Sequence, residues 1–168
     1  MKGTSIIVTA NPGGVFEEGI INGTPKPGVV LEMDDTVAAV GNCFTWQPYG
    51  TTAGSSGQGV DNDGDQKIIA ILLEKKDEGG VYDRSYVDAE RCFIYFPLMG
   101  ELFNMILEDV AGTGDDFFIG EELMVDDGTG KLLTADNNAE AHPFTCLETI
   151  TNPTADHYAW VRYNGSAG

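Results

Sequence analysis

The chain is 168 residues long, and its 27 acidic residues against nine basic ones give a formal net charge of −18. With 42% hydrophobic and 10% aromatic residues, it carries the core-forming side chains that a disordered acidic tail lacks. Nucleic-acid binding needs clustered Lys and Arg, and a membrane span needs about 18 consecutive apolar residues, neither of which is present. We therefore expect one folded domain, or one domain with an insertion, that binds neither nucleic acid nor a membrane.

The first part of the chain has too little apolar content to fold on its own. It holds one short strand candidate, Ser5–Thr9, followed by the turn-forming stretches Asn11–Gly14 and Pro25–Pro27. We expect residues 1–27 to form an extended N-terminal arm that a partner orders, and residues 28–168 to form a single β domain.

Short strands separated by turns with Gly and Pro follow the arm. From residue 29 to residue 34, alternation predicts a strand with odd-numbered residues facing inward and even-numbered ones facing water. The inner residues are Val29, Leu31 and Met33, and the outer residues are Val30, Glu32 and Asp34. A second strand is predicted to carry Ala38, Val40, Phe44 and Trp46.

The middle of the chain combines a polar stretch with an apolar one. The segment Gln47–Asp65 is rich in Gly, Ser, Thr and Asp, which predicts a long exposed loop. The apolar run Ile68–Leu73 is typical of a strand covered on both faces, although periodicity alone leaves a buried helix open. We expect residues 47–90 to be a loop-rich insertion in the β domain.

The second half of the chain continues the pattern of short strands. The connection Asp126–Gly130 contains two glycines that can adopt positive φ, and it predicts a β-hairpin. No segment of ten or more residues shows a convincing helical period with both caps, so the predicted fold class is all-β. Strands are expected at Cys92–Phe96, Leu102–Leu107, Phe117–Ile119, Leu123–Val125, Lys131–Leu133, Phe144–Ile150 and Tyr158–Tyr163.

The residues that usually carry chemistry are sparse. His142 and His157 lack the spacing of zinc ligands, and Gly54–Gly59 matches neither a nucleophile elbow nor a phosphate loop. We expect no catalytic residues, no cofactor and no metal site, and hence no enzyme. The three cysteines lie far apart among apolar neighbours, which indicates free buried thiols made in a reducing cytoplasm. They are Cys43, Cys92 and Cys146.

One acidic turn, Asp61–Asp65, resembles the oxygen-rich start of a calcium loop. The EF-hand register fails, because Gln66 stands where the glycine of the sharp turn belongs and Leu72 stands where a bidentate Glu is needed. A solvated acidic turn is the simpler interpretation, and a cation site at this turn stays open.

Four segments are informative when taken together. They are Phe16–Glu32 with its Lys-Pro-Gly-Val-Val entry, the hairpin Phe118–Leu132, and the closing segments Pro143–Glu148 and Ala159–Tyr163. This set resembles the capsid decoration proteins of tailed bacteriophages, also called cement or head-stabilising proteins. The resemblance implies a small β-barrel or β-sandwich that forms a homotrimer and sits on the outer surface of the virion capsid. Its partner there is the major capsid protein, whose neighbouring subunits it clamps. Residues 47–115 match nothing in that family.

The resemblance also implies where the capsid is contacted. An extended arm can add a strand to an exposed sheet edge, and Ser5–Thr9 has the β propensity for this. Three arms on one trimer would raise the avidity about 10²–10⁴-fold. A strand within its own domain is the alternative for Ile6–Val8. The predicted capsid-contact residues are Ser5, Ile6, Ile7, Val8, Thr9, Val15 and Phe16.

A carbohydrate- or receptor-binding β-sandwich is the alternative function. Trp46 and Tyr49, with the Gly-rich loop beyond them, would form an aromatic platform for a sugar or another ligand. Core packing is the other interpretation of Trp46.

Overall fold

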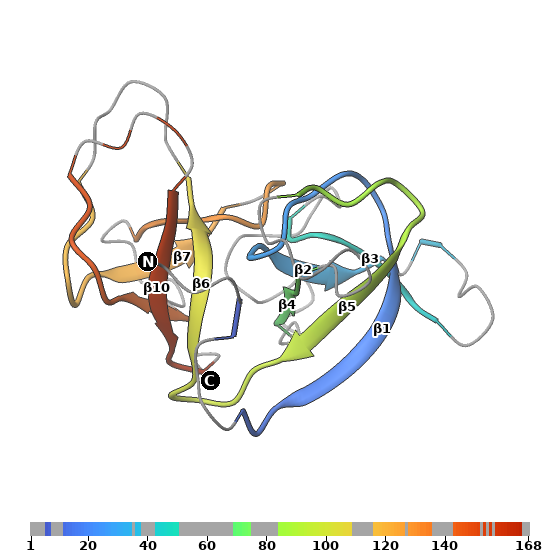
Figure 1. The fold of residues 1–168 in the computed structure, drawn as a ribbon, viewed down its shortest axis with the longest axis horizontal. Helices are drawn as coiled ribbons and strands as arrows, with labels where there is room; N and C mark the ends of the chain where they lie inside the picture. The colour runs from blue at the N-terminus through green and yellow to red at the C-terminus, as the bar shows by residue number, and fades with distance from the viewer. Residues whose placement is uncertain are drawn as a thin grey trace.

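In the computed structural model, ten strands within the described part of the chain form two closed five-stranded barrels that lie side by side (Figure 1). Within the residues described, no helix is long and apolar enough to span a membrane. The structure describes residues 6–7, 12–34, 36–37, 43–50, 69–74, 84–108, 116–126, 128–135, 143–151, 153, 155 and 157–165. These strands confirm the all-β prediction and, of its two architectures, the barrel.

The strand order in each barrel is as follows. The first barrel runs β1 (Val15–Ile21), β3 (Thr45–Pro48), β2 (Val30–Met33), β4 (Ala70–Leu72) and β5 (Arg91–Phe96). The second runs β10 (His157–Tyr163), β6 (Leu102–Leu107), β8 (Leu132–Thr134), β7 (Glu122–Val125) and β9 (Phe144–Cys146). The pairs β1–β3 and β6–β8 are parallel, and the other pairs are antiparallel.

The predicted hairpin is present. Strands β7 and β8 pair in antiparallel register from Leu123 opposite Thr134 to Val125 opposite Leu132. Gly128 and Gly130 adopt φ angles of +89° and +67° in the connection, where a residue with a Cβ would be strained. The sequence predicts this hairpin because the turn glycines and both flanking strands lie within a dozen residues of each other.

The exposure predicted for the strand near residue 30 is wrong. Val30, Glu32 and Asp34 were expected to face water, but they are 0%, 4% and 4% exposed, and Met33, expected inside, is 48% exposed. Val30 packs in a core shared by both barrels, whereas Leu31 packs in a core on the other face of β2. Alternation fails at Val30 because the second barrel covers a face that would otherwise meet solvent. Glu32 and Asp34 are instead hydrogen-bonded within the first barrel, to the side chains of Gln47 and Asn22.

The predicted insertion at residues 47–90 also needs correction. Its strand β4 is an integral member of the first barrel, paired with both β2 and β5. Ala70, Ile71 and Leu72 are all fully buried, which confirms the expected strand covered on both faces. Asp61–Asp65, the acidic turn, lies outside the described residues.

The predicted boundary of the arm at residue 27 is wrong as well. Residues 15–21 form β1, which pairs with β5 over six residue pairs and with β3 at Ile20 and Ile21. The apolar residues of β1 look sparse in sequence because its first four residues are exposed and only Gly19 and Ile21 are buried. The regular fold therefore begins well before residue 28.

The two barrels are joined by main-chain hydrogen bonds as well as by apolar contacts. Gly130 accepts a hydrogen bond from Val30 at 2.7 Å, and Gly128 donates one to Tyr49 at 2.8 Å. The carbonyl of Gly28 accepts a hydrogen bond from Ile106 N–H at 3.0 Å, and Gly28 N–H donates one to the carbonyl of Leu72. The shared core includes Val30, Ile71 and Tyr95 from the first barrel and Phe103, Met105, Leu132 and Val161 from the second.

Candidate functional site

The first half of β1 lies at the surface, along the outer side of the first barrel next to β5 (Figure 1). Val15 is 58% exposed and Phe16 is 49% exposed, and Glu17 and Glu18 after them are exposed as well. Among the described residues, the other edge of β1 pairs with β3 only at Ile20 and Ile21. We call the four residues from Val15 to Glu18 the β1 ribbon.

The β1 ribbon borders a depression of about 290 Å³ lined by Phe16, Glu17, Glu18 and Phe93. The Phe16 ring packs against Tyr95 with 4.7 Å between ring centroids. Glu18 forms an ion pair with Arg91 at 2.9 Å, and both side chains are well exposed. The depression therefore combines aromatic surface with the carboxylate of Glu17, which fits a partner that offers an apolar side chain beside a basic one.

The chain just before the ribbon is fastened by a buried carboxylate. Glu101 is 6% exposed and accepts hydrogen bonds from the Tyr95 hydroxyl at 2.7 Å and from the main-chain N–H groups of Gly13 and Leu98 at 2.6 and 2.8 Å. Gly14 N–H donates to the Tyr95 hydroxyl at 2.7 Å. A Cβ on Gly14 would collide with the Phe96 carbonyl oxygen and the Tyr95 ring, so the chain passes closer here than any other residue allows.

These contacts shift the titration of both groups. Burial opposes ionisation of Glu101, but the hydrogen bonds from Leu98, Tyr95 and Gly13 outweigh it and lower the pKa of this carboxyl group. Burial, together with the hydrogen bond to Glu101, raises the pKa of Tyr95 to about 12. At neutral pH Glu101 is therefore an ionised carboxylate that accepts hydrogen bonds from neutral donors.

The predicted capsid-contact residues fall into three groups in the structure. Val15 and Phe16 lie on the ribbon and are exposed. Ile6 is 0% exposed in the shared core, and Ile7 forms an isolated β-bridge with Phe103, so these two residues of the arm pack within their own domain. Ser5, Val8 and Thr9 lie outside the described residues.

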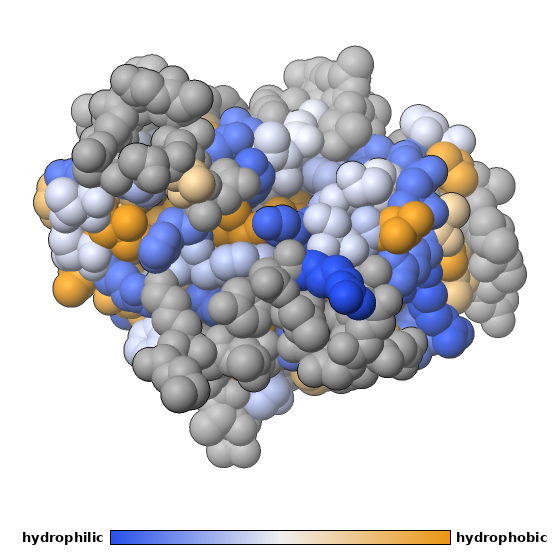
Figure 2. Space-filling model, turned by 45° about the horizontal axis from the view of Figure 1, so that its top comes forward, coloured by the Kyte–Doolittle hydropathy of each residue, from blue (hydrophilic) through white to orange (hydrophobic). Residues whose placement is uncertain are grey.

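Exposed apolar side chains also occur away from the ribbon. Met99 is 75% exposed, Phe118 54% and Ile119 68%. On the face drawn in Figure 2, hydrophobic side chains (orange) lie in several separate groups among hydrophilic ones (blue). Since isolated exposed apolar residues are ordinary, hydrophobicity alone does not select a site. The ribbon stands out because it joins exposed aromatic surface, a depression and a rigidly fastened main chain.

The aromatic platform of the alternative function is absent. Trp46 is 4% exposed and Tyr49 is 1% exposed, and both pack in the cores. Side chains buried to this extent have no face available for stacking on a sugar.

Cys92 and Cys146 are free and buried as predicted, whereas Cys43 is half-buried. Burial raises the pKa of Cys92 to about 12.

His157 is exposed at the start of β10, and His142 lies outside the described residues. Among the residues that the structure describes, no group of three or more His, Cys, Asp or Glu side chains could hold a metal ion.

Sequence reasoning missed Phe93 and the fastening pair of Tyr95 and Glu101. The strand β5 was predicted, and Phe93 and Tyr95 alternate along it with Cys92 and Ile94. Its pairing with β1 was not predicted, because β1 lies some 75 residues earlier in the chain. One local feature could have indicated a structural role for Glu101. It lies three residues after Leu98 in a turn, and its carboxylate accepts a hydrogen bond from Leu98 N–H.

Comparisons with known proteins give a fold but no family. No protein-family model and no curated protein matches the chain. Among solved structures, the N base of the head fiber gp8.5 of bacteriophage phi29 is similar, with a TM-score of 0.52 and 7% sequence identity. The similarity covers 90% of this chain and 94% of that one, so it includes strands of both barrels. At this identity the match shows a shared fold.

Proposed function

We propose that this chain is a structural protein of a phage virion, which decorates the outside of the capsid and stabilises contacts between major capsid subunits. The observation that carries the proposal is the fold match to a phage head fiber base, which extends over nearly the whole of both chains. The resemblance of Phe16–Glu32, Phe118–Leu132 and the closing segments to capsid decoration proteins points to the same class by a separate argument. The proposed role is binding, without catalysis.

The β1 ribbon is the surface that we assign to the major capsid protein. Val15 and Phe16 offer exposed apolar area, and Glu17 offers negative charge beside it, whereas Glu18 is already paired with Arg91. The hydrogen bonds of Glu101 and Tyr95 hold the preceding chain in place, which lowers the entropy cost of ordering it on binding. Ile6 is left out of this assignment because it belongs to the shared core.

Oligomerisation and charge complete the proposal. In a homotrimer, three ribbons would act together, and linked contacts can raise avidity by about 10²–10⁴ over a single weak contact. The net charge of −18 would keep densely displayed trimers apart on the shell, through repulsion that salt weakens.

Sedimentation with purified mature capsids stripped of this protein tests the function. We expect the wild-type protein to co-sediment until its sites are saturated and to raise the melting temperature of the capsids. Phe16→Ala should weaken binding about tenfold or more, as truncation of an aromatic anchor does. Phe118→Ala is the matched control, since Phe118 is about as exposed but lies on the second barrel.

Two results would contradict the proposal at different levels. Absence of co-sedimentation would reject the decoration function altogether. Binding that survives Phe16→Ala but is lost in Phe118→Ala would keep the function and move the contact surface to the second barrel.

A further inference from the structure

Strand β10 presents an aromatic ring and a cation on its outer face. Ala159 and Val161 pack in the shared core, so the alternate residues Trp160 and Arg162 face away from it. Trp160 is 40% exposed, and Arg162 is exposed as well. Within the described part of the chain, Arg162 forms no ion pair and the indole N–H of Trp160 donates no hydrogen bond. Since tryptophan and arginine are enriched at the energetic centres of protein interfaces, these two residues, the β10 pair, suit a protein partner.

A turn on the other barrel presents an apolar side chain beside a carboxylate. In this turn, at residues 87–90 just before β5, Val87 is 64% exposed and Asp88 is exposed. Asp88 Oδ1 accepts a hydrogen bond from Gly23 N–H at 2.8 Å, and Asp88 Oδ2 has no partner among the residues described. The turn therefore offers a carboxylate oxygen next to apolar surface, which is the complement of the β10 pair.

Hydrogen bonds hold this turn in one conformation. Glu90 N–H donates to the Val87 carbonyl at 3.0 Å, and the Glu90 carboxylate accepts from Val87 N–H at 2.7 Å. Ala89 N–H donates to the carbonyl of Ile21 in β1 at 2.9 Å. Ala89 has a φ of +61°, a left-handed conformation that residues other than glycine rarely adopt. A turn that is already formed loses little conformational entropy when a partner binds it.

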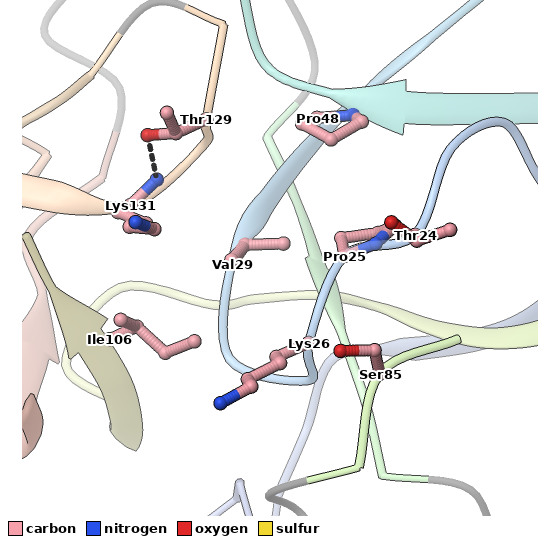
Figure 3. A pocket seen from close by; sticks show the side chains of 9 residues that line it. All are labelled: Thr24, Pro25, Lys26, Val29, Pro48, Ser85, Ile106, Thr129 and Lys131. Carbon is pink, nitrogen blue, oxygen red and sulfur yellow. Dashed lines mark hydrogen bonds between the residues drawn. The ribbon is translucent and has the colours of Figure 1, made fainter. Parts of the chain in front are cut away.

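The junction of the barrels keeps the β10 pair and the turn at a fixed distance from each other. A pocket of about 340 Å³ lies at this junction, and Figure 3 shows side chains of both barrels around it. Its polar groups are paired within the molecule, since Lys131 forms an ion pair with Glu108 at 3.6 Å and the Thr129 hydroxyl donates to Asp126 at 2.6 Å. Together with the shared core, these contacts join the two barrels into one body.

We propose that copies of this chain associate head to tail, with Arg162 of one copy bound to Asp88 of the next and Trp160 packed against Val87. The two surfaces lie on different barrels (Figure 1), so a second copy can satisfy them. Charge complementarity selects this partner, because every copy carries both halves of the contact.

A contact between two different surfaces leaves each copy able to bind one neighbour on either side, and three such contacts can close a ring. The inference rests on the homotrimer of the proposed function and assigns its subunit contact. It leaves the β1 ribbon of each copy to the capsid, since neither surface includes a residue of the ribbon.

Sedimentation equilibrium of the purified full chain, without capsids, tests the contact. We expect the wild type to be a trimer at micromolar concentration, and Trp160→Ala, Arg162→Asp and Asp88→Arg each to weaken association at least tenfold. The double variant with both Arg162→Asp and Asp88→Arg should recover most of the association, because it exchanges the two charges and restores the net charge. Lys26→Asp is the matched control, since it changes the net charge as Arg162→Asp does, at another exposed position.

Three results would overturn the inference. A wild type that stays monomeric or stops at a dimer would show that no ring forms. Equal weakening by Lys26→Asp and Arg162→Asp would mean general repulsion between acidic chains. A double variant as weak as the single variants would show that the two side chains do not meet. Because no capsid is present, each of these results leaves the co-sedimentation test of the proposed function unaffected.

Discussion

Glu101 illustrates how one buried side chain fixes the start of a strand that is distant in sequence. Its carboxylate accepts main-chain hydrogen bonds from both Gly13 and Leu98, 88 and three residues away. The Tyr95 hydroxyl bridges the same carboxylate to Gly14. Because a buried acceptor of this kind satisfies several donors at once, its loss leaves each of them unpaired.

Glu101→Gln should lower the free energy of unfolding by about 1–3 kcal/mol at neutral pH, since it removes charge-assisted hydrogen bonds and turns an amide NH₂ toward donors. Urea denaturation at neutral pH measures the loss. Asp116→Asn, a carboxylate change outside this cluster, is the control.

The same variant should change the pH dependence of stability. Folding lowers the pKa of Glu101 below its ordinary value of 4.5. Its stabilising contribution is therefore complete above pH 4.5 and decreases as the pH falls through the folded pKa. The stability difference between wild type and Glu101→Gln should shrink below pH 4.5, and a difference that stays constant into acid would show that the carboxylate's charge is not what stabilises the site.

At the scale of elements, the connection Asp126–Gly130 both closes a hairpin and fastens the two barrels. Gly130 accepts from Val30 N–H, and Gly128 donates to the Tyr49 carbonyl. A Cβ on Gly130 would collide with the carbonyl oxygen of Val30, whereas a Cβ on Gly128 would meet open space. Both glycines have positive φ, so they form a matched pair that differs in packing alone.

Gly128→Ala should cost about 1–2 kcal/mol of unfolding free energy, the strain of a left-handed residue. Gly130→Ala should cost about 2–4 kcal/mol, because the same strain is joined by separation of the hairpin from β2. Thermal and urea unfolding of both variants would measure the difference, and equal costs would mean that the docking of the hairpin contributes nothing.

Sequence patterns predicted elements well where the determinants were local. The hairpin from Leu123 to Leu133 and strand β6 were predicted closely, since alternation and turn glycines lie within each segment. The burial of Val30 and the role of Ile6 were not predictable, because the groups that cover them come from the other barrel. Trp46 shows the same limit, since core packing and ligand stacking favour the same aromatic side chain.

The candidate sites were only partly predicted, because some of their residues also come from distant segments of the chain. Val15 and Phe16 came from a local resemblance, and the structure places both at the surface. Phe93 joins Phe16 only through the β1–β5 ladder. Sites assembled from segments 70 or more residues apart leave little trace in a single sequence.

At the scale of the molecule, two small barrels share one apolar core and are joined by several main-chain hydrogen bonds. The chain has a large net negative charge because its acidic residues far outnumber its basic ones. A rigid body of this kind suits a protein that binds a lattice by one surface while repelling its neighbours. In the proposed function, that lattice is the capsid.

Cryo-electron microscopy of stripped mature capsids, imaged with and without the added protein, tests this account most directly. We expect the difference map to show two-barrel density on the outer surface of the shell, with the β1 ribbon toward the major capsid protein. A map without added density, or with density on the inner surface, would contradict it.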